Sequence, residues 1–153
     1  MTSKSVTINQ AGITTTFSFS GSGQLYNGTQ RNLTVCPTPS NATYSTSGNY
    51  WGINAGTYIA YAAATGSYVG QATYYWTIEK AGQTNVSISA SSTSITAGQS
   101  VSFSASGGSG PGNFVWSGAS EAGSNSSASR TFSSPGDYTV SVYRQGGQNY
   151  LDS

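Results

Sequence analysis

The feature of this sequence that most constrains its fold is a two-residue alternation of apolar and polar side chains. Near the start of the chain it places Ile13, Phe17 and Phe19 on one face, with hydroxyl residues between them. Because successive side chains of a strand point to opposite faces, this pattern predicts half-buried β-strands. An alanine-rich segment, 58–64, is short and rich in aromatic and β-branched residues, so we expect a strand there too. The alternation recurs in 74–78, 86–90, 101–105 and 138–142.

Turns rich in glycine separate these segments at short intervals, and no helical pattern intervenes. Strands at this density are typical of antiparallel sandwiches rather than of a parallel sheet. A chain of 153 residues is long enough for two small sandwiches. The composition changes from tyrosine-rich to serine-rich at the small link Lys80–Gln83. We therefore expect two domains, residues 1–81 and 82–153.

The chemistry available to the chain is limited by its charge. It has five Lys or Arg, four Asp or Glu and no His. General acid/base catalysis, nucleophile activation and most metal sites depend on these residue types, so we expect no enzyme, no metal and no cofactor. The cations are scattered singly, which argues against nucleic-acid binding. The sequence contains no run of about 18 apolar residues, so we expect no membrane insertion. Cys36 has no partner for an intrachain disulfide, and we expect it to be a small buried residue.

Ordered motifs in the first half resemble a known family. They are 25–29 (Leu-Tyr-Asn-Gly-Thr), 54–58 (Asn-Ala-Gly-Thr-Tyr), 64–68 (Ala-Thr-Gly-Ser-Tyr) and 77–81 (Thr-Ile-Glu-Lys-Ala). Their order and spacing resemble the small immunoglobulin-related repeats of large bacterial adhesins, which carry a Tyr-Asn/Asp-Gly signature. Trp76, at the centre of an alternating run, is expected in the core of this domain.

The second half resembles bacterial and phage immunoglobulin-like (Ig-like) domains of the PKD or Big type. The matching segments are 97–103, 114–117 and 134–142. This resemblance implies that Trp116 fills the space between two sheets and that Tyr138 places its hydroxyl against the backbone at a strand corner. Together the two halves indicate an all-β chain of two tandem Ig-like antiparallel β-sandwiches.

Aromatic residues supply the candidate contact sites. Tyr44, Tyr50 and Trp51 lie among Ser, Asn and Gly in a segment with poor strand periodicity, where exposed rings can stack on a sugar or anchor a protein partner. The alternative is that Tyr50 and Trp51 cover the edge of a core. The alternation also predicts that at least one of Tyr61, Tyr75 or their neighbours faces outward.

These observations favour a non-catalytic structural protein of a phage virion, either a capsid decoration (cement) protein or another accessory head or tail protein. The chain starts at Met1 without an apolar signal segment, so we expect synthesis in the host cytoplasm and a place on the particle surface. The expected partners are a major capsid or tail protein and other copies of the chain, for which Ser5–Asn9 is a candidate added strand. The alternatives are an adhesin or carbohydrate-binding module that binds host-surface glycans, and a small enzyme.

Overall fold

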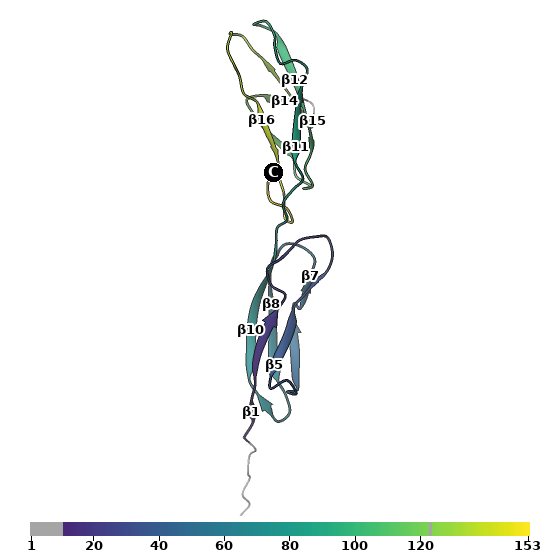
Figure 1. Cartoon of the computed structure of the whole chain (residues 1–153), viewed down its shortest axis with the longest axis vertical. Coiled ribbons are helices and arrows are strands. Elements are labelled where there is room, and N and C mark those ends of the chain that lie inside the picture. The colour runs from purple at the N-terminus through teal and green to yellow at the C-terminus, as the bar shows by residue number, and fades with distance from the viewer. Residues whose placement is uncertain (1–10, 123) are drawn as a thin grey trace, which may run out of the picture. The chain divides into compact units, whose positions relative to one another are not determined.

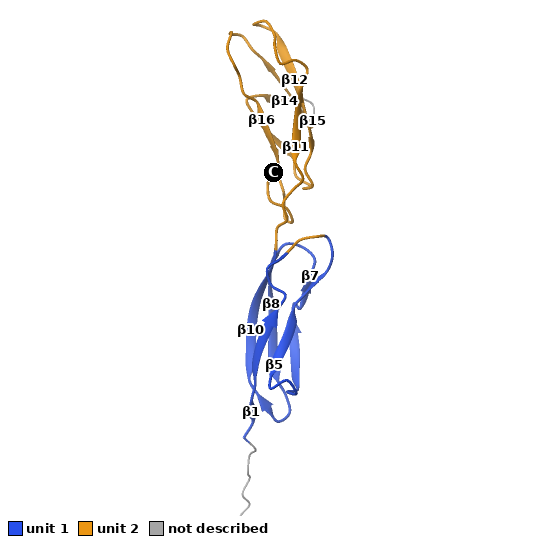
Figure 2. Cartoon of the chain, in the orientation of Figure 1, with its two compact units in different colours: residues 1–24, 28–78 blue, residues 25–27, 79–153 orange. Residues whose placement is uncertain are grey.

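The structure is a computed structural model that describes residues 11–122 and 124–153. Strands account for 52% of it, and no helix occurs in these two ranges, so the prediction of an all-β protein is confirmed. Two compact units are present (Figure 2): unit 1 holds the residues up to Gln24 with Gly28–Ile78, and unit 2 holds Leu25–Asn27 with Glu79–Ser153. Within the described ranges, nothing helical is long and apolar enough to cross a membrane.

A four-stranded sheet, in the order β3-β10-β8-β6, forms the main layer of unit 1 (Figure 1). Strands β10 and β6 both run antiparallel to β8, while β2 pairs with β5, β4 with β7 and β1 with β9. The strands in this half of the chain are β1 (Ile13–Thr14), β2 (Thr16–Ser20), β3 (Gln24–Leu25), β4 (Arg31–Asn32), β5 (Thr34–Thr38), β6 (Tyr44–Gly48), β7 (Trp51–Gly52), β8 (Gly56–Ala64), β9 (Tyr68–Val69) and β10 (Gln71–Glu79).

The core of unit 1 is built around Trp76, whose side chain is fully buried. The Trp76 ring stacks on Tyr58 at 4.8 Å between centroids, and its indole N–H donates to the main-chain oxygen of Asn49 at 2.7 Å. Ala60 and Ala62 of β8 are also buried, and their small side chains leave room for the large rings beside them. The alternation in 58–64 and 74–78 therefore directs the aromatic core residues of this unit, Tyr58 and Trp76, to the inner face of the sheet.

Phenylalanines of β2 contact the same four-stranded sheet. Phe19 stacks on Tyr74 at 4.7 Å, and Phe17 meets Tyr44 edge-on at 5.7 Å. On the paired strand β5, Pro37 and Val35 lie opposite these phenylalanines and are half-buried. Cys36, between them, lies opposite Ser18. Cys36 is exposed, so the expectation that it is buried is wrong. The two-residue period of β5 places its sulfur on the outer face.

Unit 2 contains a four-stranded sheet in the order β11-β12-β15-β14 and a pair of strands, β13 and β16. Each pairing in these two sheets is antiparallel. Val101 and Ala105 of β12 and Ala128 of β15 are buried on the inner face, and Trp116 of β13 lies 6.5 Å from the Phe103 ring. The strands are β11 (Val86–Ala90), β12 (Ser100–Gly107), β13 (Phe114–Ser117), β14 (Ser120–Ala122), β15 (Ser124–Thr131) and β16 (Ser141–Arg144).

Arg144 organises the glycine-rich loop of unit 2. Its guanidinium group donates to the main-chain oxygens of Gly107 and Gly108 at 3.0 Å each and to that of Gly112 at 3.1 Å. The same group lies 5.2 Å from the centre of the Phe114 ring. The loop folds closely around this side chain, since a Cβ at Gly108 would come within 2.7 Å of Cδ of Arg144.

Candidate functional site

The outer face of the four-stranded sheet in unit 1 carries two exposed tyrosines. Tyr61 of β8 is 42% exposed and Tyr75 of β10 is 67% exposed. Both alternate with the buried residues that form the core, so their outward direction follows from the strand period. The sequence-based prediction that at least one of them faces outward is correct, and both do.

The strand register makes these tyrosines diagonal neighbours. Tyr75 lies opposite Ile59, and Tyr61 lies opposite Thr73. Side chains at diagonal positions of an antiparallel pair are roughly 7–8 Å apart, within reach of aromatic rings. Ser47 extends the row across β6, since it pairs with Tyr61. The result is a tyrosine face, defined here as Tyr61 and Tyr75 with Thr73 and Ser47, which both pair with Tyr61.

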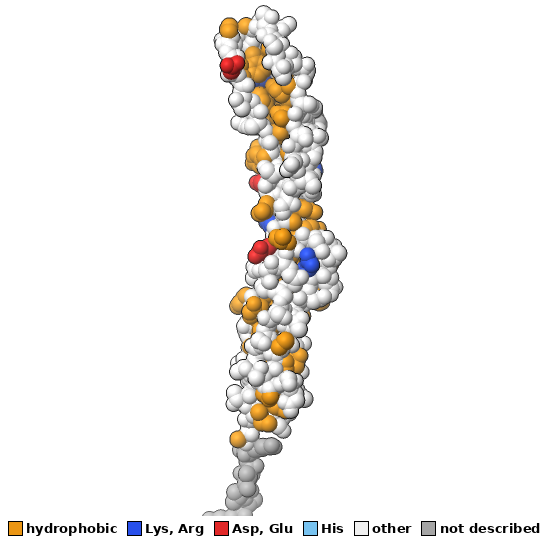
Figure 3. Space-filling view, viewed as in Figure 1, with side chains coloured by type: hydrophobic (Ala, Val, Ile, Leu, Met, Phe, Trp, Pro, Cys, Tyr) orange, Lys and Arg blue, Asp and Glu red, His pale blue; other side chains and the backbone are white. Residues whose placement is uncertain are grey.

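No charged residue interrupts this face along 57–63 of β8 or 71–77 of β10. The space-filling view shows the wider pattern, in which neutral polar atoms cover most of the visible surface, charged side chains are isolated and hydrophobic ones gather in patches (Figure 3). A contact through the tyrosine face therefore requires desolvation of rings and hydroxyls but not of ions, which lowers its cost.

Tyr50, just after the edge strand β6, is hydrogen-bonded to the backbone of β8. Its hydroxyl donates to the main-chain oxygen of Tyr61 at 2.6 Å. Burial raises the pKa of Tyr50 above its usual value, and the neighbouring Tyr44 raises it further. Tyr44 is 37% exposed, and one edge of it rests on the β2 core. Tyr44 and Tyr50, both candidates from the sequence, therefore lie close together, but the register places the Tyr44 side chain on the opposite face of the sheet from Tyr61.

Trp51, the third candidate, lies in a different sheet. It is 58% exposed on β7, where it pairs with Asn32 of β4. Its neighbour Gly52 is buried, and a Cβ there would lie 2.5 Å from Cζ of Tyr58. Gly52 has to be small for Tyr58 to fit, and the strand period then directs the Trp51 ring outward. The sequence-predicted set is therefore two separate surfaces rather than one cluster.

Several charged side chains of unit 2 serve local structure. Lys80 donates to the main-chain oxygen of Gly147 at 2.7 Å. Arg130 donates to that of Gly118 at 2.9 Å, and Arg144 holds the glycine loop described above. In the described part of the chain, no group of three or more His, Cys, Asp or Glu residues could hold a metal ion.

Comparisons of the chain with protein-family models, with curated proteins and with solved structures found no match. The two aromatic surfaces, the tyrosine face and the exposed Trp51, are therefore the candidate sites of this chain. Sequence reasoning also missed a third feature, an open groove in unit 2, because a groove left where strands do not pair has no local sequence motif.

Proposed function

We propose that this chain is a non-catalytic structural protein with two Ig-like domains, which binds the surface of a phage virion as a capsid decoration protein or another accessory head or tail protein. Its partner is then the major capsid or tail protein. The observation that carries the proposal is the tyrosine face: Tyr61 and Tyr75 are exposed diagonal neighbours on a stretch of sheet, 57–63 of β8 and 71–77 of β10, that has no charged residue.

The strand arrangement of unit 2 supports the Ig-like part of the proposal. The order β11-β12-β15-β14, with β13 paired to β16, corresponds to the A-B-E-D and C-F pairings of an Ig constant-type sandwich. The Tyr138 hydroxyl donates to the main-chain oxygen of Ser134 at 3.0 Å, four residues upstream. This contact has the form of the tyrosine corner of such folds. Trp116, on the C-equivalent strand, is half-buried and donates its indole N–H to Asn125 O at 2.8 Å.

The composition of the tyrosine face supports binding to protein. The cores of protein interfaces are enriched in Tyr and depleted of charge, because rigid rings bury a large area at little cost in entropy. A single face of this size gives a weak contact. Many copies on a symmetric shell would bind together, and multivalency then compensates for the weakness of each contact. The use of Arg130 and Arg144 to hold backbone oxygens supports a structural rather than a catalytic role.

The experiment has two steps. Mass spectrometry of purified particles whose genome encodes this chain should find it in high copy number. Particles that lack the protein are then incubated with the wild-type chain, with Tyr61→Ser/Tyr75→Ser or with Tyr143→Ser. Tyr143 is a matched control because it is 38% exposed, on β16 of unit 2. We expect the double variant to lose binding and the control to retain it. Absence of the protein from the particles, or equal binding of all three chains, would refute the proposal.

Trp51 favours a second candidate function, a carbohydrate-binding module of a bacterial surface protein. An exposed indole beside the amide of Asn32 offers a stacking surface and hydrogen-bonding groups, which are the elements of a sugar site. A glycan array with the whole chain tests this function. Sugar-dependent binding that disappears in Trp51→Ala would support it, and an array without sugar-dependent signal would exclude it for the glycans present.

A further inference from the structure

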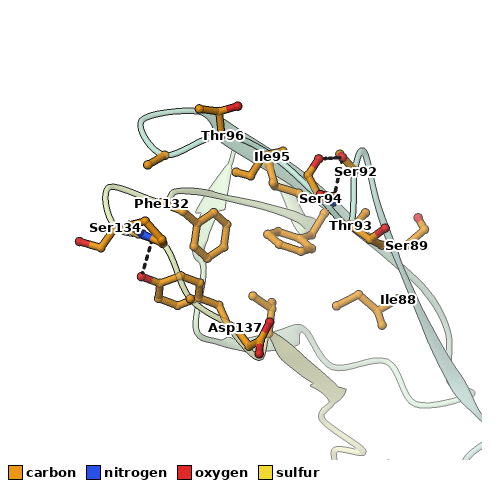
Figure 4. Close-up of a pocket in the computed structure, with 18 residues that line it drawn as sticks. Ile88, Ser89, Ser92, Thr93, Ser94, Ile95, Thr96, Phe132, Ser134 and Asp137 are labelled. Carbon is orange, nitrogen blue, oxygen red and sulfur yellow. Dashed lines mark hydrogen bonds between the residues drawn. The ribbon is translucent and has the colours of Figure 1, made fainter.

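Unit 2 is open on one side. A groove of about 770 Å³ lies between the inner face of β11 and β12 and residues 134–140. Its lining mixes apolar and hydroxyl side chains, and Ile88, Ile95 and Phe132 surround the hollow from different sides (Figure 4). Ile88 faces the same side of the sheet as buried Ala105, yet it is 44% exposed. An inward-facing isoleucine with this exposure shows that the sandwich lacks cover at this point.

The backbone beside the groove also lacks partners. β13 pairs with β16 only over Ser141–Arg144, and residues 137–140 continue that strand's path without belonging to a strand. Within the described ranges, no main-chain hydrogen bond joins 137–140 to another segment. A groove lined by both apolar and hydroxyl side chains, next to an unpaired strand edge, is an arrangement that accepts an added β-strand with one apolar and one polar face.

We propose that this groove binds residues 5–9 of a second copy of the chain as an added strand. Val6 and Ile8 alternate with Ser5, Thr7 and Asn9, so one face of such a strand is apolar and the other polar. This segment lies outside the described residues. Five residues in a strand span about 17 Å, and the ten residues before Ala11 reach up to about 35 Å when extended, which is enough to enter a neighbouring molecule.

Charge complementarity supports this occupant. Among the residues that line the groove, all of them described, Asp137 alone is charged. Lys4 is the only charged side chain before Arg31, and it has the same parity as Val6 and Ile8. A strand that directs Val6 and Ile8 into the groove therefore directs Lys4 to the same side, where Asp137 is the one charged lining residue. The inference goes beyond the proposed function, because it concerns contacts between copies and does not require a virion.

Sedimentation velocity of the full chain over a concentration series tests the proposal. We expect concentration-dependent assembly that is weakened at least about tenfold by Val6→Asp/Ile8→Asp and by Ile88→Glu, since each removes buried apolar area. Ile53→Glu is the matched control, because Ile53 is 42% exposed in unit 1. Lys4→Glu and Asp137→Lys should each weaken assembly, and the two together should restore it.

Hydrogen exchange supplies an independent measurement. A synthetic peptide of residues 2–10, added to the Val6→Asp/Ile8→Asp chain, should slow exchange of the amides of 137–140 in the groove. A chain that stays monomeric up to millimolar concentration would overturn the proposal. So would assembly that persists in Val6→Asp/Ile8→Asp, since another surface or occupant would then be responsible. A peptide that leaves the exchange of 137–140 unchanged would also contradict it.

Discussion

Replacement of Trp76 by phenylalanine measures how strongly unit 1 depends on its central ring. Trp76 is fully buried, and its indole N–H donates to Asn49 O at 2.7 Å. The variant leaves that oxygen without its donor, which costs about 1–3 kcal/mol. It also leaves a void of roughly 40 Å³, which at about 24 cal/mol per Å³ costs about 1 kcal/mol more. We expect unit 1 to lose about 2–4 kcal/mol of its free energy of unfolding.

Trp116→Phe is the matched control in unit 2. Trp116 makes the same kind of bond, to Asn125 O at 2.8 Å, but that bond is exposed, and water replaces the lost donor. Its cost should be about 0.5–1.5 kcal/mol. Hydrogen exchange of the full chain across a urea series reports on each unit separately, through peptides from β10 and from β13. A loss below about 1 kcal/mol in Trp76→Phe, or one no larger than in Trp116→Phe, would refute the reasoning.

Two further variants test the edge of the tyrosine face and the glycine loop. The raised pKa of Tyr50 means that the folded state favours the neutral phenol, so the free energy of unfolding should fall as pH rises past 10.0 through that raised pKa. Urea titrations from about pH 8 to pH 11 should show a smaller fall in Tyr50→Phe, and an equal fall would contradict the assignment. Arg144→Lys keeps the charge but loses the planar fork, so unit 2 should lose about 1–3 kcal/mol and amides in 107–112 should exchange faster. Unchanged exchange there would show that the loop folds without this side chain.

Local periodicity was enough to predict β2, β8, β10, β11 and β12. The alternation in 58–64 and 74–78 depends only on which side chains share a face, and β8 and β10 follow it. It also predicted an outward-facing tyrosine. That Tyr61 and Tyr75 are neighbours could not be predicted, because their relation depends on the register between β8 and β10, which the turn between them sets.

The expectation for Cys36 was wrong because it relied on the usual burial of cysteine rather than on the strand period. Cys36 was expected to be buried because cysteine usually is, whereas its place between Val35 and Pro37 puts it on the outer face of β5. The groove of unit 2 is a different case. It exists because residues 137–140 lack a partner strand, and the absence of a long-range pairing leaves no local signal in the sequence.

The central claim is that the tyrosine face of unit 1 is a docking surface. A cryo-EM reconstruction of particles that carry the protein tests it most directly, because it shows which sheet face lies against the shell. We expect the side chains of Tyr61 and Tyr75 to be buried against the capsid or tail protein. Density that places unit 1 on the particle with this face open to solvent would contradict it.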